Sequence, residues 1–546
     1  MAKIFGVSAG RERFPHMDVR ELQMQKFVES RVNKGMITML DPADIEPGAM
    51  QLIRNATVRF DRTARRPGSR PFTPGQPDAH PVMRLAFMKK KEGNAYTVRL
   101  TPESVHTMAT VDWNVIAGIL TGTVKDRFQT TVVLDEFVFA NNGVDYLQVV
   151  DFVAQTFGRL GNAPRYRYVT GMFNRVVGAA RRDENEIEVG WSADADVYEW
   201  NPLVNETAGS SPIIDSPADL SDWIKGIFAF TTVGILLREK SVWLITKVPI
   251  PQNPFAFHPA VPGIGCDSPF SAAIIGDGLA WLDRRTGTVY AFTPGSPLEA
   301  IGRPIEKSIV ANIDDPETIF SSYDPIANEY SICIPQVPGG ELVVVWTYNR
   351  RNKAWAKNEY QSITSINDAE LAVAGTQIDQ LGPVPINSLP GTIDGLSPTE
   401  SIIVSRTFGR ADGSMAIEDI NEDIDAPQDG FPTGYVYPTQ LVSKAFTVPE
   451  DDIYIAQINI EYQSNRGGTF TLEYSKTGGA VTDLGLPGSW KLAKTVTPTV
   501  LGQPRLLIFR RMLHCRRFAW RLTTTAGLFE TLSYEVHVYP SGKSRK

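Results

Sequence analysis

Short runs of β-branched and aromatic residues, separated by turn residues, dominate the chain from residue 82 onward. The densest example lies between Thr318 and Lys357, where four such runs are separated by three turns rich in Pro, Gly or Asn. β-branched and aromatic side chains fit a pleated sheet, whereas Pro, Gly and Asn end strands. Four antiparallel strands in about 40 residues is the size of one β-propeller blade. The alternative is an ordinary β-meander in another all-β fold.

The same pattern recurs along the chain, and this recurrence favours a propeller. Candidate blades fall at 83–122, 130–150, 165–201, 226–248, 270–293 and 317–357. Six such sheets would close a ring without exposed sheet edges, although their irregular spacing leaves the count open by one. We therefore predict an all-β protein containing an irregular β-propeller of about six blades. In the second blade, Asn141-Asn142-Gly143 predicts a hairpin turn between the strands 130–140 and 144–150.

The two ends of the chain differ from this middle part. Residues 1–72 are predicted to be an N-terminal arm and a segment leading into the propeller, with Asp18 as the N-cap of a helix reaching Val28. This arm either docks on a neighbouring subunit or is a frayed terminus. Residues 73–400 are predicted to form the propeller. Alternating strands in residues 401–546 predict a β-sandwich-like module.

Composition limits the classes of function. The chain of 546 residues has 61 acidic and 54 basic side chains and a net charge of −7, which argues against wrapping nucleic acid through a basic surface. DNA passing without being gripped is compatible with this charge. Cys266, Cys333 and Cys515 lack metal-ligand spacing and are interpreted as reduced thiols of a protein made in a cytoplasm. No run of about 18 apolar residues predicts a membrane-spanning helix.

Candidate catalytic chemistry is sparse in the sequence. The six histidines are scattered, and there is no HExxH motif, no P-loop and no GxGxxG after a strand. We expect no enzyme, no cofactor and no metal site. The alternative is a carbohydrate-binding or glycoside-hydrolysing propeller, which needs carboxylates and aromatic side chains at one propeller mouth. The candidate aromatics already have core positions in the predicted strands: Trp191, Trp200, Trp243, Trp281, Trp346 and Trp355.

One basic cluster is the strongest run of charge in the chain. It contains Arg510, Arg511, Arg516 and Arg517. We predict that these arginines form an interface with a negatively charged neighbour or with DNA. The alternative is a solvated loop whose arginines cover apolar surface.

Three segments resemble a known family. Residues 41–48, Asp-Pro-Ala-Asp-Ile-Glu-Pro-Gly, are followed by Arg65-Arg66-Pro67-Gly68, and this order resembles the opening of tail hub, or nozzle, proteins of short-tailed bacteriophages. Residues 391–396, Gly-Thr-Ile-Asp-Gly-Leu, resemble a connector of that family, and residues 518–524 resemble its closing strands. Without the resemblance, the Pro-Gly pairs predict turns and the arginines predict a solvated loop.

The resemblance implies a non-enzymatic virion protein in the phage tail, assembled in the cytoplasm of the host bacterium. In that family identical copies, commonly six, form a ring below the head-to-tail adaptor. The ring encloses and gates the DNA ejection channel and anchors fibres or spikes. Expected partners are therefore other copies of the chain in a homo-hexamer, the adaptor, a fibre or spike, and double-stranded DNA in transit without specific binding. We further expect an acidic or neutral channel wall, with Asp412 and residues 418–425 nearer the lumen than the arginine cluster.

Overall fold

The computed structural model describes most of the chain between residues 25 and 540. Within that span it leaves out residues 30, 60–61, 73–75, 93–94, 109–111, 124–125, 142, 337–341, 374–400, 420–421, 423, 428–433, 448–451, 465–467, 478–489, 499–500, 502 and 525–528. The described part is built almost wholly from strands. Its helical elements are α1 (Glu306–Val310) and the 3-10 turns η1 (Pro217–Ser221), η2 (Pro269–Ser271) and η3 (Arg303–Ile305). No helix among the described residues is long and apolar enough to cross a membrane.

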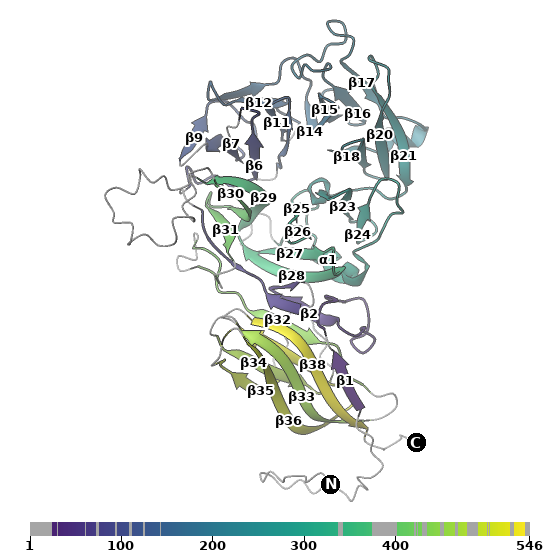
Figure 1. Ribbon diagram of the computed structural model, residues 1–546. Coiled ribbons are helices and arrows are strands. Elements are labelled where there is room, and N and C mark those ends of the chain that lie inside the picture. The colour runs from purple at the N-terminus through teal and green to yellow at the C-terminus, as the bar shows by residue number, and fades with distance from the viewer. Residues whose placement is uncertain are drawn as a thin grey trace, which may run out of the picture.

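Seven antiparallel sheets stand around one axis and form a β-propeller, the upper part of Figure 1. The first two blades are β6 (Arg84–Lys89), β7 (Ala95–Leu100), β8 (Val105–Met108) and β9 (Trp113–Ile116), then β10 (Gln129–Val133), β11 (Glu136–Ala140), β12 (Gln148–Asp151) and β13 (Thr156–Arg159). The third and fourth are β14 (Tyr166–Met172), β15 (Arg175–Arg181), β16 (Glu188–Trp191) and β17 (Gly209–Pro212), then β18 (Ile224–Ala229), β19 (Val233–Arg238), β20 (Ser241–Lys247) and β21 (Phe255–Pro262). The fifth has three strands, β22 (Ala273–Ile275), β23 (Gly278–Asp283) and β24 (Thr288–Phe292). The all-β propeller prediction is confirmed.

The sixth blade shows how the sequence produces one of these sheets. It contains β25 (Phe320–Asp324), β26 (Glu329–Pro335), β27 (Leu342–Asn349) and β28 (Ala354–Gln361), which match the four predicted runs. The Asp324 Oδ1 atom accepts hydrogen bonds from the backbone N–H groups of Ile326 and Ala327, at 2.8 and 2.9 Å. An Asp that bonds its own following backbone reverses the chain at this position. Local side chains therefore determine where the first hairpin of this blade turns.

The second blade turns at a different position from the predicted one. Leu134 and Asp135 have φ angles of 51° and 65° and connect β10 to β11, inside the run 130–140 that was predicted as one strand. A two-residue hairpin loop needs two positive φ angles, which Asp tolerates better than most residues. The predicted Asn-Gly turn instead falls in the longer connection between β11 and β12. Asn142 itself lies outside the described residues.

A seventh blade closes the ring, so the sequence-based count of about six is one blade short. It consists of β29 (Ile363–Val373), β30 (Ser401–Arg410), β31 (Met415–Asp419) and the N-terminal strand β5 (Gly68–Pro71). β29 lies between β25 of the sixth blade and β6 of the first. The blade draws on all three predicted domains, so the boundaries predicted after residues 72 and 400 do not separate structural units. Sequence patterns cannot show a sheet whose outer strands are far apart along the chain.

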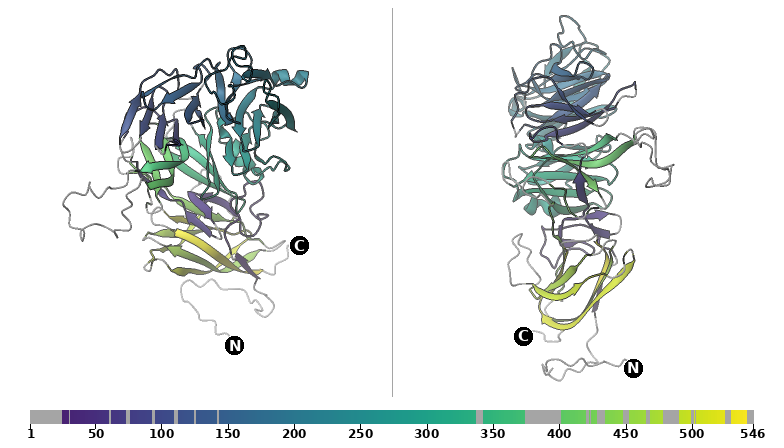
Figure 2. Two further views of the ribbon diagram at one scale, coloured as in Figure 1. Left: turned by 45° about the horizontal axis from the view of Figure 1, so that its top comes forward. Right: turned by 90° about the vertical axis from the view of Figure 1, so that its left-hand side faces the viewer.

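The lower part of the molecule is a β-sandwich. Its first sheet has the strand order β3 (Ala56–Arg59), β4 (Arg62–Arg65), β38 (Phe529–Pro540), β33 (Ile453–Ser464) and β36 (Pro504–Cys515), with β1 (Gln25–Glu29) also paired to β38. The second has the order β2 (Met50–Arg54), β32 (Thr439–Ser443), β37 (Ala519–Thr524), β34 (Phe470–Ser475) and β35 (Lys491–Val496). The rings of Trp520 and Tyr534 meet edge to face at 5.0 Å between the sheets. Figure 2 shows the sandwich below the propeller in two further views.

Residues 25–36 belong to this sandwich. Residues 25–29, predicted as the end of a helix, form β1, in which Phe27 faces Val536 of β38. Val32 and Met36 are fully buried in the same core. β1 adds a strand to an existing sheet, and this tertiary pairing overrides the helical tendency of the local sequence. Residues 1–24, which include Asp18, lie outside the described residues.

Propeller and sandwich share one core. β28 of the sixth blade continues into the second sandwich sheet through a parallel pairing of Lys357 with Arg54 in β2. A single apolar cluster runs from Trp346 in the sixth blade through Ile53 in β2 to Val536 in β38. Because the core and the sheet are continuous, the two parts form one body without a flexible linker.

Candidate functional site

The predicted arginine cluster lies on a sheet edge, not on a loop. Arg510 and Arg511 are in β36, which pairs only with β33 among the described strands and so forms the edge of its sheet. The Arg510 Nε–H donates to Gln457 Oε1 at 3.0 Å. Arg516 follows the strand and is exposed, and Arg517 forms an ion pair with Asp41 at 3.2 Å. The solvated-loop alternative is therefore wrong about the local structure.

The surroundings of the cluster are basic and partly apolar. Residues 490–517 contain seven Lys or Arg and no Asp or Glu, in a chain of net charge −7. Leu506 and Met512 on β36 are 56% and 51% exposed. β35, the edge strand of the second sheet, lies on the same side of the sandwich and adds Lys491 and Lys494. We call β35 and β36 with these side chains the basic edge. Unpaired edges are usually covered or made charged in native proteins.

Among the residues that carry the family resemblance, those at positions 65–68 lie at the junction of propeller and sandwich, whereas residues 391–396 lie outside the described residues. The Arg66 guanidinium is 1% exposed and lies between the rings of Tyr360 and Tyr437, 4.0 and 3.5 Å from their centroids. It donates to both carboxylate oxygens of Asp425, at 2.8 and 2.6 Å. Burial acts to lower the pKa of Arg66, but the Asp425 carboxylate outweighs it and the pKa rises. The prediction of a solvated arginine loop is wrong here, because the partners are about 300 residues or more away in sequence.

Of the carboxylates expected near a channel lumen, Glu418, Asp419 and Asp425 lie at this junction, whereas Asp412 is in the turn between β30 and β31 and Asp423 lies outside the described residues. Asp425 is held by Arg66, and Asp419 pairs with Arg70 at 3.4 Å. Burial raises the pKa of Glu418, against the charges of Arg406 and Arg59. Asp425 therefore balances an arginine inside the molecule, whereas the pair of Asp419 with Arg70 is partly exposed.

A polar cluster at the seam between the first and seventh blades was not visible in the sequence. Asp78 accepts hydrogen bonds from Arg99 at 2.7 Å and from the Ser104 hydroxyl at 2.9 Å. Arg99 also lies 3.1 Å from His106 Nδ1 and donates to the Gly413 carbonyl at 3.4 Å. The Ser104 hydroxyl donates to Asp78 and lies 3.5 Å from the His106 Nδ1 atom, which also faces Arg99. The cluster fastens the seventh blade to the first.

Both ionisable partners of Arg99 have shifted pKa values. Burial and the Arg99 charge lower the pKa of His106 to about 4. Burial acts to raise the pKa of Asp78, but the hydrogen bond and charge of Arg99 outweigh it and hold the pKa well below its usual range. The imidazole is therefore neutral and the carboxylate ionised at neutral pH. The ionised Asp78 beside Arg99 stabilises the contact between the first and seventh blades.

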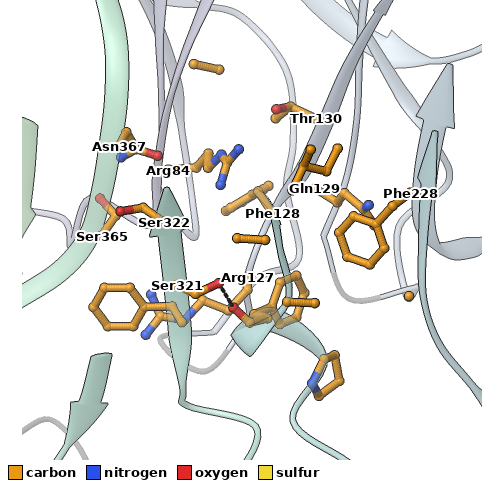
Figure 3. A pocket seen from close by; sticks show the side chains of 18 of the residues that line it. Arg84, Arg127, Phe128, Gln129, Thr130, Phe228, Ser321, Ser322, Ser365 and Asn367 are labelled. Atoms are coloured by element: carbon orange, nitrogen blue, oxygen red, sulfur yellow. Dashed lines mark hydrogen bonds between the residues drawn. The ribbon is translucent and has the colours of Figure 1, made fainter. Parts of the chain in front are cut away.

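The propeller axis contains a cavity of about 540 Å³. All seven innermost strands contribute to it, and Figure 3 shows its polar and aromatic side chains. We call this cavity the axial bore. Its lining contains no Asp, Glu, His, Lys or Cys among the described residues, so the carboxylates that the glycoside-hydrolase alternative needs are not there. The tryptophans assigned to the core, at positions 191, 200, 243, 281, 346 and 355, are all buried. No group of three potential metal ligands occurs in the described part of the chain.

Comparison with known proteins adds similarity at the level of solved structures alone. No family model matches the chain, and no curated protein does. Virginiamycin B lyase from Staphylococcus aureus is 8% identical, with 73% of this chain and 99% of that chain covered and a TM-score of 0.34. The WD40 domain of SCAP from fission yeast is 11% identical, with 61% and 81% covered and a TM-score of 0.29. At these scores neither similarity supports an argument about function.

Proposed function

We propose that this protein is a non-enzymatic structural subunit of a short phage tail, a tail hub or nozzle protein. In this role six copies form a ring below the head-to-tail adaptor, enclose and gate the DNA ejection channel, and anchor fibres or spikes. DNA passes through the ring without specific binding. The protein would be part of the virion after assembly in the host cytoplasm.

One observation carries the proposal. Two described segments that resemble the hub family make contacts far along the chain: Arg66 and Gly68 join the propeller to the sandwich, and Asp41 pairs with Arg517 at the basic edge. The N-terminal segment is therefore part of the contact between propeller and sandwich. A body with one continuous core suits a ring subunit, because neighbouring copies must keep a fixed geometry.

The basic edge is the surface we assign to the contact with a neighbouring copy. Subunits of a closed ring meet through two different surfaces, so a basic surface on one copy can face an acidic one on the next. Residues 183–223 of the third blade and its following loop contain eleven Asp or Glu and no Lys or Arg. Several of these acids pair within their own blade, as Glu188 does with Arg181, whereas Asp196 and Glu206 are exposed. Placing the basic edge between subunits also keeps its arginines away from DNA.

The test is the assembly state of the purified full-length protein. We expect class averages from electron microscopy and native mass spectrometry to show closed rings of six. Arg510→Glu combined with Arg511→Glu should reduce the ring fraction strongly, whereas Arg284→Glu, at an exposed turn of the fifth blade, should not. A protein that stays monomeric with and without its adaptor, or that hydrolyses fluorogenic glycosides, would contradict the proposal.

A further inference from the structure

The axial bore has two unlike halves. The blades follow one another around the axis, so blades six, seven, one and two form one half and blades three, four and five the other. The first half contributes most of the polar side chains, Ser322, Ser365, Asn367, Arg84, Gln129 and Thr130, beside apolar ones such as Phe87 and Phe128. The second half is mainly apolar, and Phe228, Phe270 and Ile274 are its partly or well exposed apolar side chains. Figure 3 shows Asn367, Ser365, Ser322 and Arg84 on one side and Phe228 on the opposite side.

Arg127 places a second positive charge in the polar half. It precedes β10 of the second blade and donates to the carbonyls of Thr318, at 3.0 Å, and Thr364, next to the sixth and seventh blades. Its guanidinium lies over the Phe320 ring, 4.3 Å from the centroid. No carboxylate among the described residues pairs with it, and burial lowers its pKa to about 10. A buried cation held only by neutral acceptors retains attraction for an anion.

Among the described residues, three buried polar atoms of the lining have no hydrogen-bond partner: the Ser322 hydroxyl and the Arg127 Nε–H in the polar half, and the Tyr168 hydroxyl in the other half. A buried donor without a partner is unfavourable, so water or a ligand is expected to satisfy it. The opposite wall offers apolar surface, since Ile274 remains 41% exposed. Water satisfies the donors but not the apolar wall.

We infer that the axial bore binds a small organic anion, with its carboxylate or phosphate group against the polar half and its apolar body against Phe228, Phe270 and Ile274. The volume of about 540 Å³ falls within the range of small-molecule sites. The positive side chains and the absence of carboxylates in the described lining favour a negatively charged ligand. The opposed apolar wall selects against inorganic ions. This inference does not depend on the proposed tail function.

Binding is tested with four probes on the full-length protein: 1-naphthoate, the neutral 1-naphthamide, the cationic 1-naphthylmethylamine, and inorganic phosphate. Calorimetry at constant ionic strength measures their dissociation constants. We expect naphthoate to bind at least about tenfold more tightly than each of the other three. Equal affinity for naphthamide would show that no anion is recognised, and equal affinity for phosphate would show that the apolar half contributes nothing. No binding of naphthoate up to about 10 mM, a free energy of about −3 kcal/mol, would mean that the bore holds water alone.

A matched pair of variants locates the site. Ile274→Asp puts a carboxylate into the bore at a partly exposed position, and we expect it to weaken naphthoate binding by at least about tenfold through charge repulsion. Ile274→Asn has the same shape without the charge and should weaken it less. Ile326→Asp adds the same charge at a 73% exposed turn of the sixth blade and should have no effect. Unchanged binding by Ile274→Asp would place the anion elsewhere and overturn the inference.

Discussion

Two buried arginines, Arg66 at the junction and Arg127 in the axial bore, differ in how their buried charge is balanced. Both guanidinium groups lie over aromatic rings, and their residues are 1% and 6% exposed. Arg66 is neutralised by Asp425, whereas Arg127 is held by two carbonyls. The pKa of Arg66 is raised and that of Arg127 lowered as a result. The charge of Arg66 is therefore neutralised within the fold, whereas the charge of Arg127 has no carboxylate partner among the described residues.

The largest effect is expected when one partner of the buried ion pair at the junction is removed. Arg66→Met leaves the Asp425 carboxylate buried without its cation, and we expect the free energy of unfolding to fall by about 3–5 kcal/mol. Chemical denaturation measures this loss. Arg66→Met combined with Asp425→Leu removes both charges and should recover most of it. A single variant as stable as Arg284→Met, at an exposed site, would show that the pair contributes nothing.

The polar cluster between the first and seventh blades makes the stability of the fold depend on pH. Because the pKa of His106 is lowered to about 4 when folded, the unfolded chain binds a proton that the folded chain does not between about pH 6.5 and 4. Stability is therefore complete above pH 6.5 and falls by up to about 3 kcal/mol as the pH drops through this window. Asp78, whose pKa is depressed, adds a loss below its unfolded value near pH 4.

Unfolding midpoints measured from pH 8 to 4 check this window. His106→Gln cannot be protonated and should flatten the profile between pH 6.5 and 4 while lowering stability at neutral pH. His258→Gln, in the outermost strand of the fourth blade, is the matched control and should keep the original slope. An unchanged profile in His106→Gln would mean that another group titrates in this range.

The bore arginine should be less costly to replace than the junction arginine. Arg127→Met removes a cation without leaving an unpaired buried anion. We expect the free energy of unfolding to fall by about 1–2 kcal/mol, from lost hydrogen bonds. The same denaturation experiment compares it with Arg66→Met. A larger loss than that of Arg66→Met would reverse the comparison.

The exposed ion pair between Arg517 and Asp41 should contribute least. Its side chains are 44% and 43% exposed, so solvent screens the attraction to below about 1 kcal/mol. A double-mutant cycle with Arg517→Gln and Asp41→Asn measures the coupling between the two charges. Coupling as large as that of the Arg66 pair would show that exposure does not decide the strength of these interactions.

The sequence predicted those elements whose strands and turns depend on neighbouring residues. The runs between Thr318 and Lys357 gave all four strands of the sixth blade, and the aromatic residue at position 355 was correctly placed in the core. The cluster at Arg510 was recognised as a charge run, but periodicity did not show that it lies on a sheet edge. Its role as an interface remains a prediction.

Features made by distant residues could not be predicted in this way. The seventh blade needs Gly68–Pro71 beside Met415–Asp419, and the burial of Arg66 needs Asp425 and Tyr437. The bore exists only once seven strands surround one axis, and no spacing in the sequence marks its lining. A motif of two arginines beside Pro-Gly looks the same in a solvated turn and in a buried junction, because the difference lies in partners several hundred residues away.

Closing the ring with an N-terminal strand has a consequence for synthesis on the ribosome. Pro71 pairs with Ala416, so β5 waits for 345 further residues before its partner strand is made. At about 5–20 residues per second, this delay is roughly 17–70 s. During that time the first blades can already be complete while β5 has no strand to pair with. The nascent chain thus carries exposed strand edges until late in translation, which makes the N-terminal segment the part that a cell must protect from premature aggregation or cleavage.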